Sequence, residues 1–545
     1  MVTPVQNEDV TTVNLSLPED RHHHDQRFAA SAEAVLEAEQ IATSTEETYG
    51  EILKSSALVG GSSALNIVIR IVRTKAMAFL LGPAGFGLAG LYGAVESFTE
   101  NVAGMGINSS GVRQIAEAVG SNDSERIAQT AAVLRRASIV LGLLGTVLLI
   151  VFSRQVSTLT FGDTKHVPGV CFLSIAVFLQ LVSYGQGALI QGTRRIADLA
   201  KMTVLGAVFG TLVGVPVVYF LRQDGVVPSL VCVAATAVIT SWWYSRKIPI
   251  SAPVMTASQI AQEAAALLKL GAAFMASGMM LTGMAYLIRI LVLRRVGFEA
   301  TGLYQSAWTL GGLYVGFVIQ AMAADFYPRL TASAADDTVC NRLVNEQVRV
   351  GLLLAGPGVI ATLTFAPLVI ALFYTSKFGA AVGVLRWICL GTTLQVVTWP
   401  MGFIIVAKGR RAIFFWSELA CAAIYAVLAW FCVSSFGLNG AGIAFFGYCL
   451  FHGFLHYPIV HRLSGFRWSS ANKRTGLFFL GSIAIVFCGL RLLPFVPAVC
   501  LGTLAAVITG VYSIRALFTL VPWNQIPRPL RRLMIGFGLV PRAAR

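Results

Sequence analysis

The chain has 545 residues, of which 56% are hydrophobic and 12% charged; its formal net charge is +15 and its mean hydropathy +0.72. Soluble globular proteins carry roughly 25% charged residues, whereas here apolar runs long enough to cross a hydrocarbon core of about 30 Å recur between about residues 52 and 520. These features exclude a soluble enzyme, a secreted disulfide scaffold and a fibrous protein. An outer-membrane barrel is excluded as well, because its strands would alternate with period two. The sequence predicts an all-α polytopic membrane protein.

Charge, cysteine usage and motifs narrow the function classes. In a membrane protein, basic residues crowd the short cytoplasmic loops, so the positive charge does not indicate nucleic acid as a partner. The nine cysteines are scattered and form no CxxC pair, which argues against a disulfide framework or a cysteine metal cluster. The sequence has no GxxxxGK[ST] loop for ATP phosphates. No catalytic residue, metal or cofactor is predicted.

Residues 1–50 are rich in Glu, Ala, Thr and Asp and are predicted to be a cytoplasmic, largely disordered tail. No basic head precedes an apolar core there, so the segment does not resemble a signal peptide. His22-His23-His24 is a run of a kind that can bind metal, but no second cluster of ligands accompanies it in the sequence.

Fourteen helices are predicted by breaking the apolar stretches at proline, glycine and charge clusters. The first six cover about residues 53–81, 86–110, 125–152, 167–191, 198–220 and 226–245. The next six cover 265–293, 300–325, 346–374, 381–406, 412–435 and 440–461. An extra pair at 476–493 and 497–520 follows. The predicted domains are the tail 1–50, a six-helix N-lobe 51–250, a six-helix C-lobe 251–465, and 466–545 with the extra pair and a basic cytoplasmic tail.

Lys and Arg in the short loops predict the topology. Sixteen lie in the loops on the side of the N-terminus and seven on the opposite side, which predicts that both termini are cytoplasmic.

An internal repeat is suggested by four short matches in the same order. They are Ile69-Arg70-Ile71 with Ile288-Arg289-Ile290, Gly90-Leu91-Tyr92 with Gly302-Leu303-Tyr304, Leu179-Gln180 with Leu394-Gln395, and Arg194 with Arg410. Their offsets are 219, 212, 215 and 216 residues. Because each unit has an even number of helices, the two lobes are predicted to be parallel repeats in a V-shaped bundle, an architecture found in transporters.

Polar residues inside the first helix point to a cavity. Ser63, Asn66, Arg70 and Arg73 follow one another at spacings of three or four residues, with Lys75 close behind, and such residues share a helix face. A charge at the centre of a membrane helix costs about 2.5–3.5 kcal/mol on insertion scales and therefore needs a wet cavity or a partner. Snorkelling to the headgroups is the alternative for Arg73 and Lys75.

Further candidates lie on the second, seventh and eighth predicted helices. Glu96 and Glu100 share a face and either pair with the arginines or take up a proton during transport. Arg289 and Gln305 are expected in the same cavity. Asp325 and Arg329 are four residues apart and either pair with each other or serve ion coupling and substrate binding, respectively. On the twelfth helix, His452 and His456 share a face, and either form a proton relay or are structural.

The predicted interior is cationic. Arg70, Arg73 and Arg289, with Lys75, would attract anions, and arginine binds phosphate with two parallel hydrogen bonds. The polar lining would hydrogen-bond sugar hydroxyls. The residues therefore predict a phosphate-bearing amphiphile or solute carried between leaflets. A cation-coupled drug exporter would instead favour an acidic cavity.

Several segments resemble Wzx-type flippases of O-antigen and enterobacterial common antigen units. They are the run at 78–116 that includes GPAGFGLAGLYGAVESF, Tyr327-Pro328-Arg329-Leu330, Thr375-Ser376-Lys377-Phe378, and Val406-Ala407-Lys408-Gly409 leading into Trp416-Ser417-Glu418-Leu419. The similarity extends over about residues 52–462. This resemblance implies the fold of the multidrug/oligosaccharidyl-lipid/polysaccharide superfamily.

The resemblance also implies a function. It implies export of an undecaprenyl-diphosphate-linked glycan to the periplasmic leaflet of the bacterial inner membrane, for polysaccharide or lipopolysaccharide biosynthesis. Membrane lipids are then partners, and a polysaccharide polymerase and chain-length proteins remain open as others. The extra helix pair departs from the usual twelve-helix pattern and leaves a lipid II-type flippase as an alternative, beside the multidrug exporter.

Overall fold

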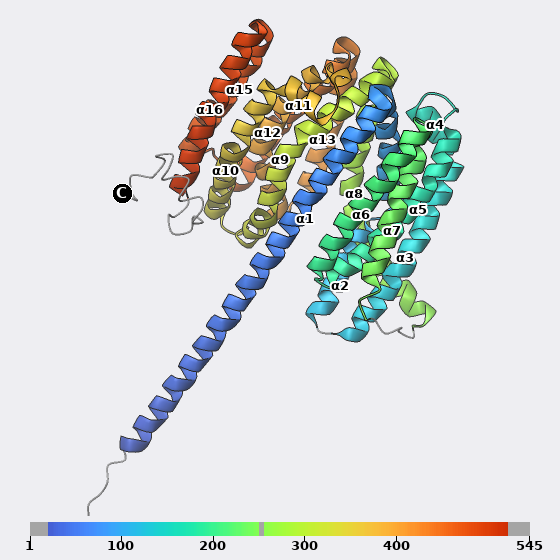
Figure 1. Ribbon diagram of the computed structural model, residues 1–545. Coiled ribbons are helices and arrows are strands. Elements are labelled where there is room, and N and C mark those ends of the chain that lie inside the picture. The colour runs from blue at the N-terminus through green and yellow to red at the C-terminus, as the bar shows by residue number, and fades with distance from the viewer. Residues whose placement is uncertain (1–19, 122, 250–254, 521–545) are drawn as a thin grey trace, which may run out of the picture. The chain divides into compact units, whose positions relative to one another are not determined.

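The structure is a computed structural model that describes residues 20–121, 123–249 and 255–520, and the regular elements within those ranges are all helices (Figure 1). Up to residue 245 the helices are α1 (Asp20–Gly104), α2 (Ile107–Gly120), α3 (Ser124–Val151), α4 (Ser153–Thr160), α5 (Val167–Gly192), α6 (Ile196–Leu221) and α7 (Val226–Ser245). After it come α8 (Ala257–Val296), α9 (Phe298–Ala332), α10 (Asp337–Thr364), α11 (Ala366–Phe373), the 3-10 helix η1 (Ser376–Phe378), α12 (Ala381–Ala407), α13 (Arg411–Phe436) and α14 (Leu438–Ser464). The chain ends in α15 (Ser470–Leu492) and α16 (Phe495–Leu520).

The chain divides into two compact units, Met1–Ser63 and Ala64–Arg545, and all contacts described below lie in the second. The helix α1 begins at Asp20, inside the stretch predicted as a tail. The side chains of His22–His24 and the basic tail after residue 520 lie outside the described part of the chain. The predicted domain boundaries stay a prediction.

Helix α1 contains a sharp break that separates the first two predicted helices. Gly82 has φ 65° and ψ −176°, a left-handed φ that favours glycine, and Pro83 follows it. The apolar part, Gly61–Gly104, is 44 residues long, or about 66 Å at the rise of an α-helix, roughly twice the hydrocarbon thickness. Arg73 and Glu96 interact electrostatically across the break, so the two segments lie side by side.

Several helices start at side-chain caps in the loops. The Asp123 carboxylate accepts a hydrogen bond from the backbone N–H of Arg126 at the start of α3, and Asp336 accepts two at the start of α10. Thr256 and Gln259 form a capping box at the start of α8. These caps satisfy backbone donors that a helix start leaves unpaired.

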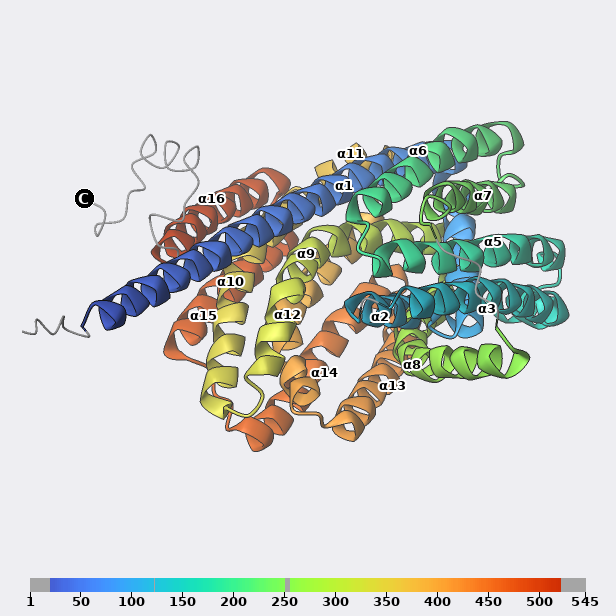
Figure 2. The ribbon, with the colours of Figure 1, turned by 90° about the horizontal axis from the view of Figure 1, so that it is seen from below.

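The helices pack into two similar groups. In the first, α5 packs against α2, α3 and α7, and α6 packs against α7. In the second, α12 packs against α9, α10 and α14, and α13 packs against α14 and α8. The pair α15 and α16 packs on α10 (Figure 2). Helix α8 contacts α2 and α3 and so joins the two groups.

Backbone conformation fixes the register of the internal repeat. Gly82 and Gly297, Arg194 and Gly409, and Arg222 and Gly437 all have positive φ. The members of each pair are 215 residues apart (82 to 297, 194 to 409, 222 to 437). Of the four sequence matches, Leu179-Gln180 with Leu394-Gln395 has this register; the others are displaced by one to four residues. In particular, the structural counterpart of Arg289 is Thr74, one turn beyond Arg70.

The predicted all-α polytopic membrane protein is confirmed. Each of the fourteen predicted ranges overlaps a helical segment of the described chain. Eleven of these helices are long and apolar enough to cross a membrane, or twelve if the bent α8, with its 41° break between Ala276 and Gly278, is one span. The set counts α1 as a single candidate span, although the sequence predicted two helices there. It includes both helices of the predicted extra pair, α15 and α16.

Candidate functional site

The cavity nearest to the predicted binding residues lies between α1 and α9, and residues at the end of α11 also line it. Its volume is about 430 Å³, within the range of small-molecule sites. Its lining residues are Ile67, Arg70, Ile71, Thr74, Gln305, Trp308, Thr309, Leu310, Gly312, Leu313, Phe373 and Tyr374.

One face of α1 forms a wall of the cavity. Ile67, Arg70, Ile71 and Thr74 line it and follow the i, i+3, i+4, i+7 spacing of a helix face. Arg70 is exposed there, so its guanidinium is available to a ligand. The cationic stripe predicted from sequence is thereby divided, because Arg73 does not line this cavity and interacts electrostatically with Glu96.

A second cation stands behind the α9 wall. Arg289 on α8 donates from Nε to the side-chain Oε1 of Gln305 at 2.7 Å and from Nη1 to the carbonyl of Ala285 at 2.7 Å. Gln305 in turn donates from Nε2 to the Thr309 hydroxyl at 3.4 Å. Both acceptors of Arg289 are neutral, so neither cancels its positive charge. Because Gln305 lines the cavity, the charge of Arg289 lies directly behind the cavity wall.

Aromatic side chains complete the lining. Tyr374 is buried, packs edge to face against Phe86 at 5.5 Å, and its phenol hydrogen-bonds to Thr309. Trp308 and Phe373 add flat apolar faces of the kind that pack against sugar rings.

Beside the cavity, the two repeats touch through equivalent glycines. Gly87 and Gly302 are 215 residues apart, and a Cβ on Gly87 would come within 2.7 Å of the Gly302 nitrogen. A Cβ on Gly302 would collide with the carbonyl oxygen of Pro83. Close backbone approach through small residues is how membrane helices pack without a hydrophobic driving force. The pseudo-symmetry axis of the repeat therefore passes near this crossing.

The structure separates other predicted residues from the cavity. Lys75 donates from Nζ to the Leu372 carbonyl at 2.7 Å. Glu100 accepts a hydrogen bond from the Tyr184 hydroxyl at 3.0 Å. Arg329, in the last turn of α9, is 24 residues from Gln305, or about 36 Å along a helix. These positions do not bring the three residues to one site with Arg70.

The structure does not place Asn66 or Asp325 in the cavity either. Asn66 is half-buried on α1, one turn before Arg70, and does not line the cavity. The side chain of Asp325 lies outside the described part of the chain.

The sequence analysis missed Thr74, Trp308, Thr309, Phe373 and Tyr374, which line the cavity. Hydroxyl and aromatic residues are common inside apolar helices, so they give no charge signal. Phe373 and Tyr374 do precede the Thr375–Phe378 segment that resembles a known family, and this was the available clue.

The described chain is thus a multi-pass helical membrane protein with a cavity that Arg70 lines between α1 and α9. Residues 76–383 match the model of the polysaccharide biosynthesis protein family, and the chain belongs to that family. It is 21% identical over 403 residues to the lipid III flippase of Escherichia coli (strain K12), a match that covers 72% of this chain and 94% of that protein. The lipid III flippase of Shigella flexneri gives the same values.

Solved structures show the same fold. The lipid II flippase MurJ in an inward closed conformation has a TM-score of 0.65 and 13% identity, over 85% of this chain and 99% of that one. An inward-facing multidrug resistance MATE family transporter of the MOP superfamily has a TM-score of 0.60 and 16% identity, over 73% of this chain and 96% of that one. The predicted fold of the superfamily is therefore confirmed.

Proposed function

We propose that the protein moves an undecaprenyl-diphosphate-linked oligosaccharide, an O-antigen or exopolysaccharide repeat unit, from the cytoplasmic to the periplasmic leaflet of a bacterial inner membrane. The observation that carries the proposal is the cavity at Arg70, with Arg289 held behind Gln305. The match to the lipid III flippases supports a lipid-linked glycan as the substrate class.

The cavity chemistry fits such a headgroup. Arg70 would bind the diphosphate with two parallel hydrogen bonds, and Arg289 would add attraction across Gln305. Thr74 and Thr309 would hydrogen-bond sugar hydroxyls, and the ring of Trp308 would pack against a sugar face. The lipid tail would stay in the bilayer, since a cavity of about 430 Å³ holds only the headgroup and adjacent sugars.

Transport would proceed by alternating access. The two repeats would rock about the Gly87–Gly302 crossing and expose Arg70 to one leaflet and then to the other. The cycle would be driven by an ion gradient or the membrane potential, with Glu96, Glu100 or Asp325 as coupling groups. Fourteen crossings, with the break at Gly82 between the first two, would place both termini in the cytoplasm.

A reconstituted flipping assay tests the proposal. Proteoliposomes would contain a short-chain undecaprenyl-diphosphate oligosaccharide, and its appearance in the opposite leaflet would be followed with and without a proton gradient. We expect Arg70→Ala to abolish flipping without loss of membrane insertion, and Arg70→Lys to restore part of it. Arg113→Ala is the matched control, because Arg113 is exposed and paired with Glu117 on α2. Full activity in Arg70→Ala, or pH-driven efflux of cationic dyes without glycan flipping, would overturn the proposal.

A further inference from the structure

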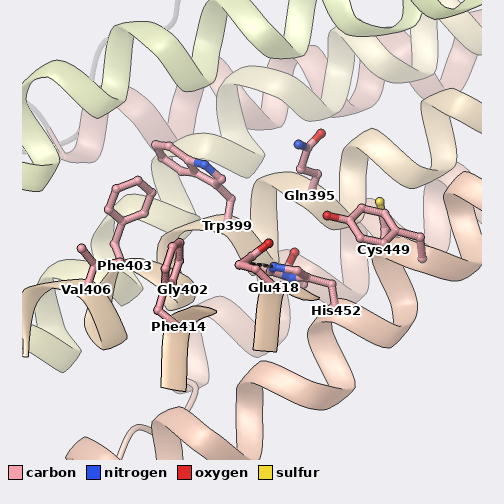
Figure 3. Close-up of a pocket in the computed structure, with 11 residues that line it drawn as sticks. Gln395, Trp399, Gly402, Phe403, Val406, Phe414, Glu418, Cys449 and His452 are labelled. Atoms are coloured by element: carbon pink, nitrogen blue, oxygen red, sulfur yellow. Dashed lines mark ion pairs between the residues drawn. The ribbon is translucent and has the colours of Figure 1, made fainter. Parts of the chain in front are cut away.

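A second cavity lies in the C-terminal half, between α12, α13 and α14, and no step proposed above uses it (Figure 3). Its volume is about 230 Å³. It extends from Val406 and Phe414, beside the α12–α13 turn, to Tyr448 and Cys449 deeper along α14. Two ionisable side chains, Glu418 on α13 and His452 on α14, project into it (Figure 3).

Three side chains converge at the wall of this cavity. Glu418 Oε1 lies 3.5 Å from Nε2 of His452 and 3.5 Å from Nε2 of His456. The imidazole rings stack with their centroids 3.9 Å apart. One ligand atom from each residue lies within 4.8 Å of the other two. His456 is fully buried, and the side chains of His452 and Glu418 are 13% and 28% exposed.

The hydrogen bonds of His456 define what its Nε2 offers. Its Nδ1 lies 3.0 Å from the carbonyl oxygen of His452. A carbonyl only accepts, so Nδ1 bears the hydrogen, and in the neutral ring Nε2 presents a lone pair. That lone pair faces the Glu418 carboxylate, which also only accepts. A cation between Nε2 and the carboxylate, either a proton or a metal ion, removes the repulsion of these two acceptors. The Ser417 hydroxyl also lies 3.5 Å from Nε2 and donates to the Phe414 carbonyl at 3.0 Å.

The spacing favours a metal ion over a shared proton. Charge-assisted N–H···O bonds are about 2.7–2.9 Å long, shorter than the 3.5 Å found on both sides of Glu418. Two ligands bound at about 2.0–2.1 Å to a tetrahedral ion are about 3.3 Å apart. Metal-bound histidines also commonly donate their other ring N–H to a backbone carbonyl, as His456 does.

We propose that Glu418, His452 and His456 bind a divalent transition-metal ion, with Zn²⁺ as the expected ion. Two imidazoles and one carboxylate suit Zn²⁺ better than Mg²⁺ or Ca²⁺, which prefer oxygen ligands. Three protein ligands would leave the fourth tetrahedral position open to the cavity, which Val406 and Phe414 also line.

The N-terminal half has no matching ligand set. At the repeat offset of 215, Glu418, His452 and His456 correspond to Thr203, Ala237 and Ser241. The first repeat therefore packs at the equivalent position without these three ionisable side chains, so the packing of the repeat does not require them. A bound ion would tie α13 to α14 in one half only. The inference does not rest on the proposed function, because metal binding is measured without transport.

Metal content of the purified full chain tests the proposal. The tag is removed and His22, His23 and His24 are replaced by alanine, since that run is another potential ligand. After incubation with Zn²⁺ and gel filtration, we expect about one ion per chain, with affinity at least about tenfold weaker in Glu418→Gln and His452→Gln. His461→Gln is the matched control, because His461 lies on the same helix and hydrogen-bonds to the Phe466 carbonyl outside the cluster.

Spectroscopy of the Co²⁺-substituted protein provides a readout that does not depend on the variants folding. We expect tetrahedral ligand-field bands, and X-ray absorption that shows two imidazoles among nitrogen and oxygen donors. A sulfur-to-cobalt charge-transfer band would place the ion on thiolates such as Cys421 or Cys449 and would overturn the assignment. A chain that retains no metal, or retains it equally in all variants, would overturn it too.

Discussion

Arg289 on α8 and Gln305 on α9 are joined by a 2.7 Å hydrogen bond in which the guanidinium donates to a neutral amide. The amide fixes the arginine without cancelling its charge. A carboxylate at the same position would form an ion pair, and the cavity would lose that positive field. Under the proposed function, the side chain at position 305 would therefore set how strongly the cavity attracts an anion to Arg70.

The first prediction follows from that pair. Gln305→Glu should neutralise Arg289 and reduce flipping of the lipid-linked glycan at least about tenfold, since one lost ionic contact is worth about 1.4 kcal/mol or more. Proteoliposome flipping measures this. Gln305→Asn, which keeps a neutral amide, is the comparison; equal activity in the glutamate and asparagine variants would show that charge at this position has no role.

Substitution at the glycine crossing should affect both stability and transport. Gly302→Ala places a Cβ against the Pro83 carbonyl, and overpacking of this kind costs about 1–3 kcal/mol. We expect a lower melting temperature and little flipping. Gly316→Ala on the same helix is the control, because Gly316 does not line the cavity and no atom lies within 4 Å of a Cβ there. Equal losses of melting temperature and flipping in the two variants would show that the close approach at the glycine crossing has no specific role.

The interaction between Arg73 and Glu96 should be recoverable by exchange. Each reversal alone, Arg73→Glu or Glu96→Arg, places like charges together inside the membrane and should abolish flipping. The double exchange should restore part of it, with a coupling energy of about 0.5–3 kcal/mol. A double-mutant cycle on flipping rates measures the coupling. If the exchange restores nothing, the two charges have separate roles.

His166 should make stability depend on pH. It lies outside the candidate spans, its Nδ1 hydrogen-bonds to the Tyr92 hydroxyl at 3.0 Å, and its ring stacks on Phe161. Burial lowers the pKa of His166 from 6.5, although Asp163 opposes the shift. The unfolded chain therefore binds this proton more readily, and the free energy of unfolding falls as pH drops below about 6.5. Thermal melts should show a shallower pH slope in His166→Phe; an identical slope would contradict this.

Hydropathy alone located the helical segments, because a membrane helix must be long, apolar and internally hydrogen-bonded. The repeat was detectable in the sequence, but three of its four matches had the wrong register. Short apolar motifs can be shifted by a helical turn and still share a face. One match, Leu179-Gln180 with Leu394-Gln395, has the register of 215, and backbone conformation at positions such as Gly82 and Gly297 identifies it as the correct one.

The candidate site was partly predictable for a similar reason. Arg70 and Arg289 are visible in the sequence because charge is rare in apolar runs. Arg73 and Lys75 gave the same signal, yet Arg73 interacts with Glu96 and Lys75 with the Leu372 carbonyl. Which cations share a cavity depends on the rotation of each helix and on its neighbours, and a single sequence does not specify these.

The break at Gly82–Pro83 also bears on how the protein is made. It leaves no loop between the two segments of α1, so we expect the second segment to follow the first into the bilayer during synthesis, as one helical hairpin. Arg73 then enters the membrane together with Glu96, its electrostatic partner. The cost of inserting a lone arginine is thereby reduced at the earliest step of membrane assembly.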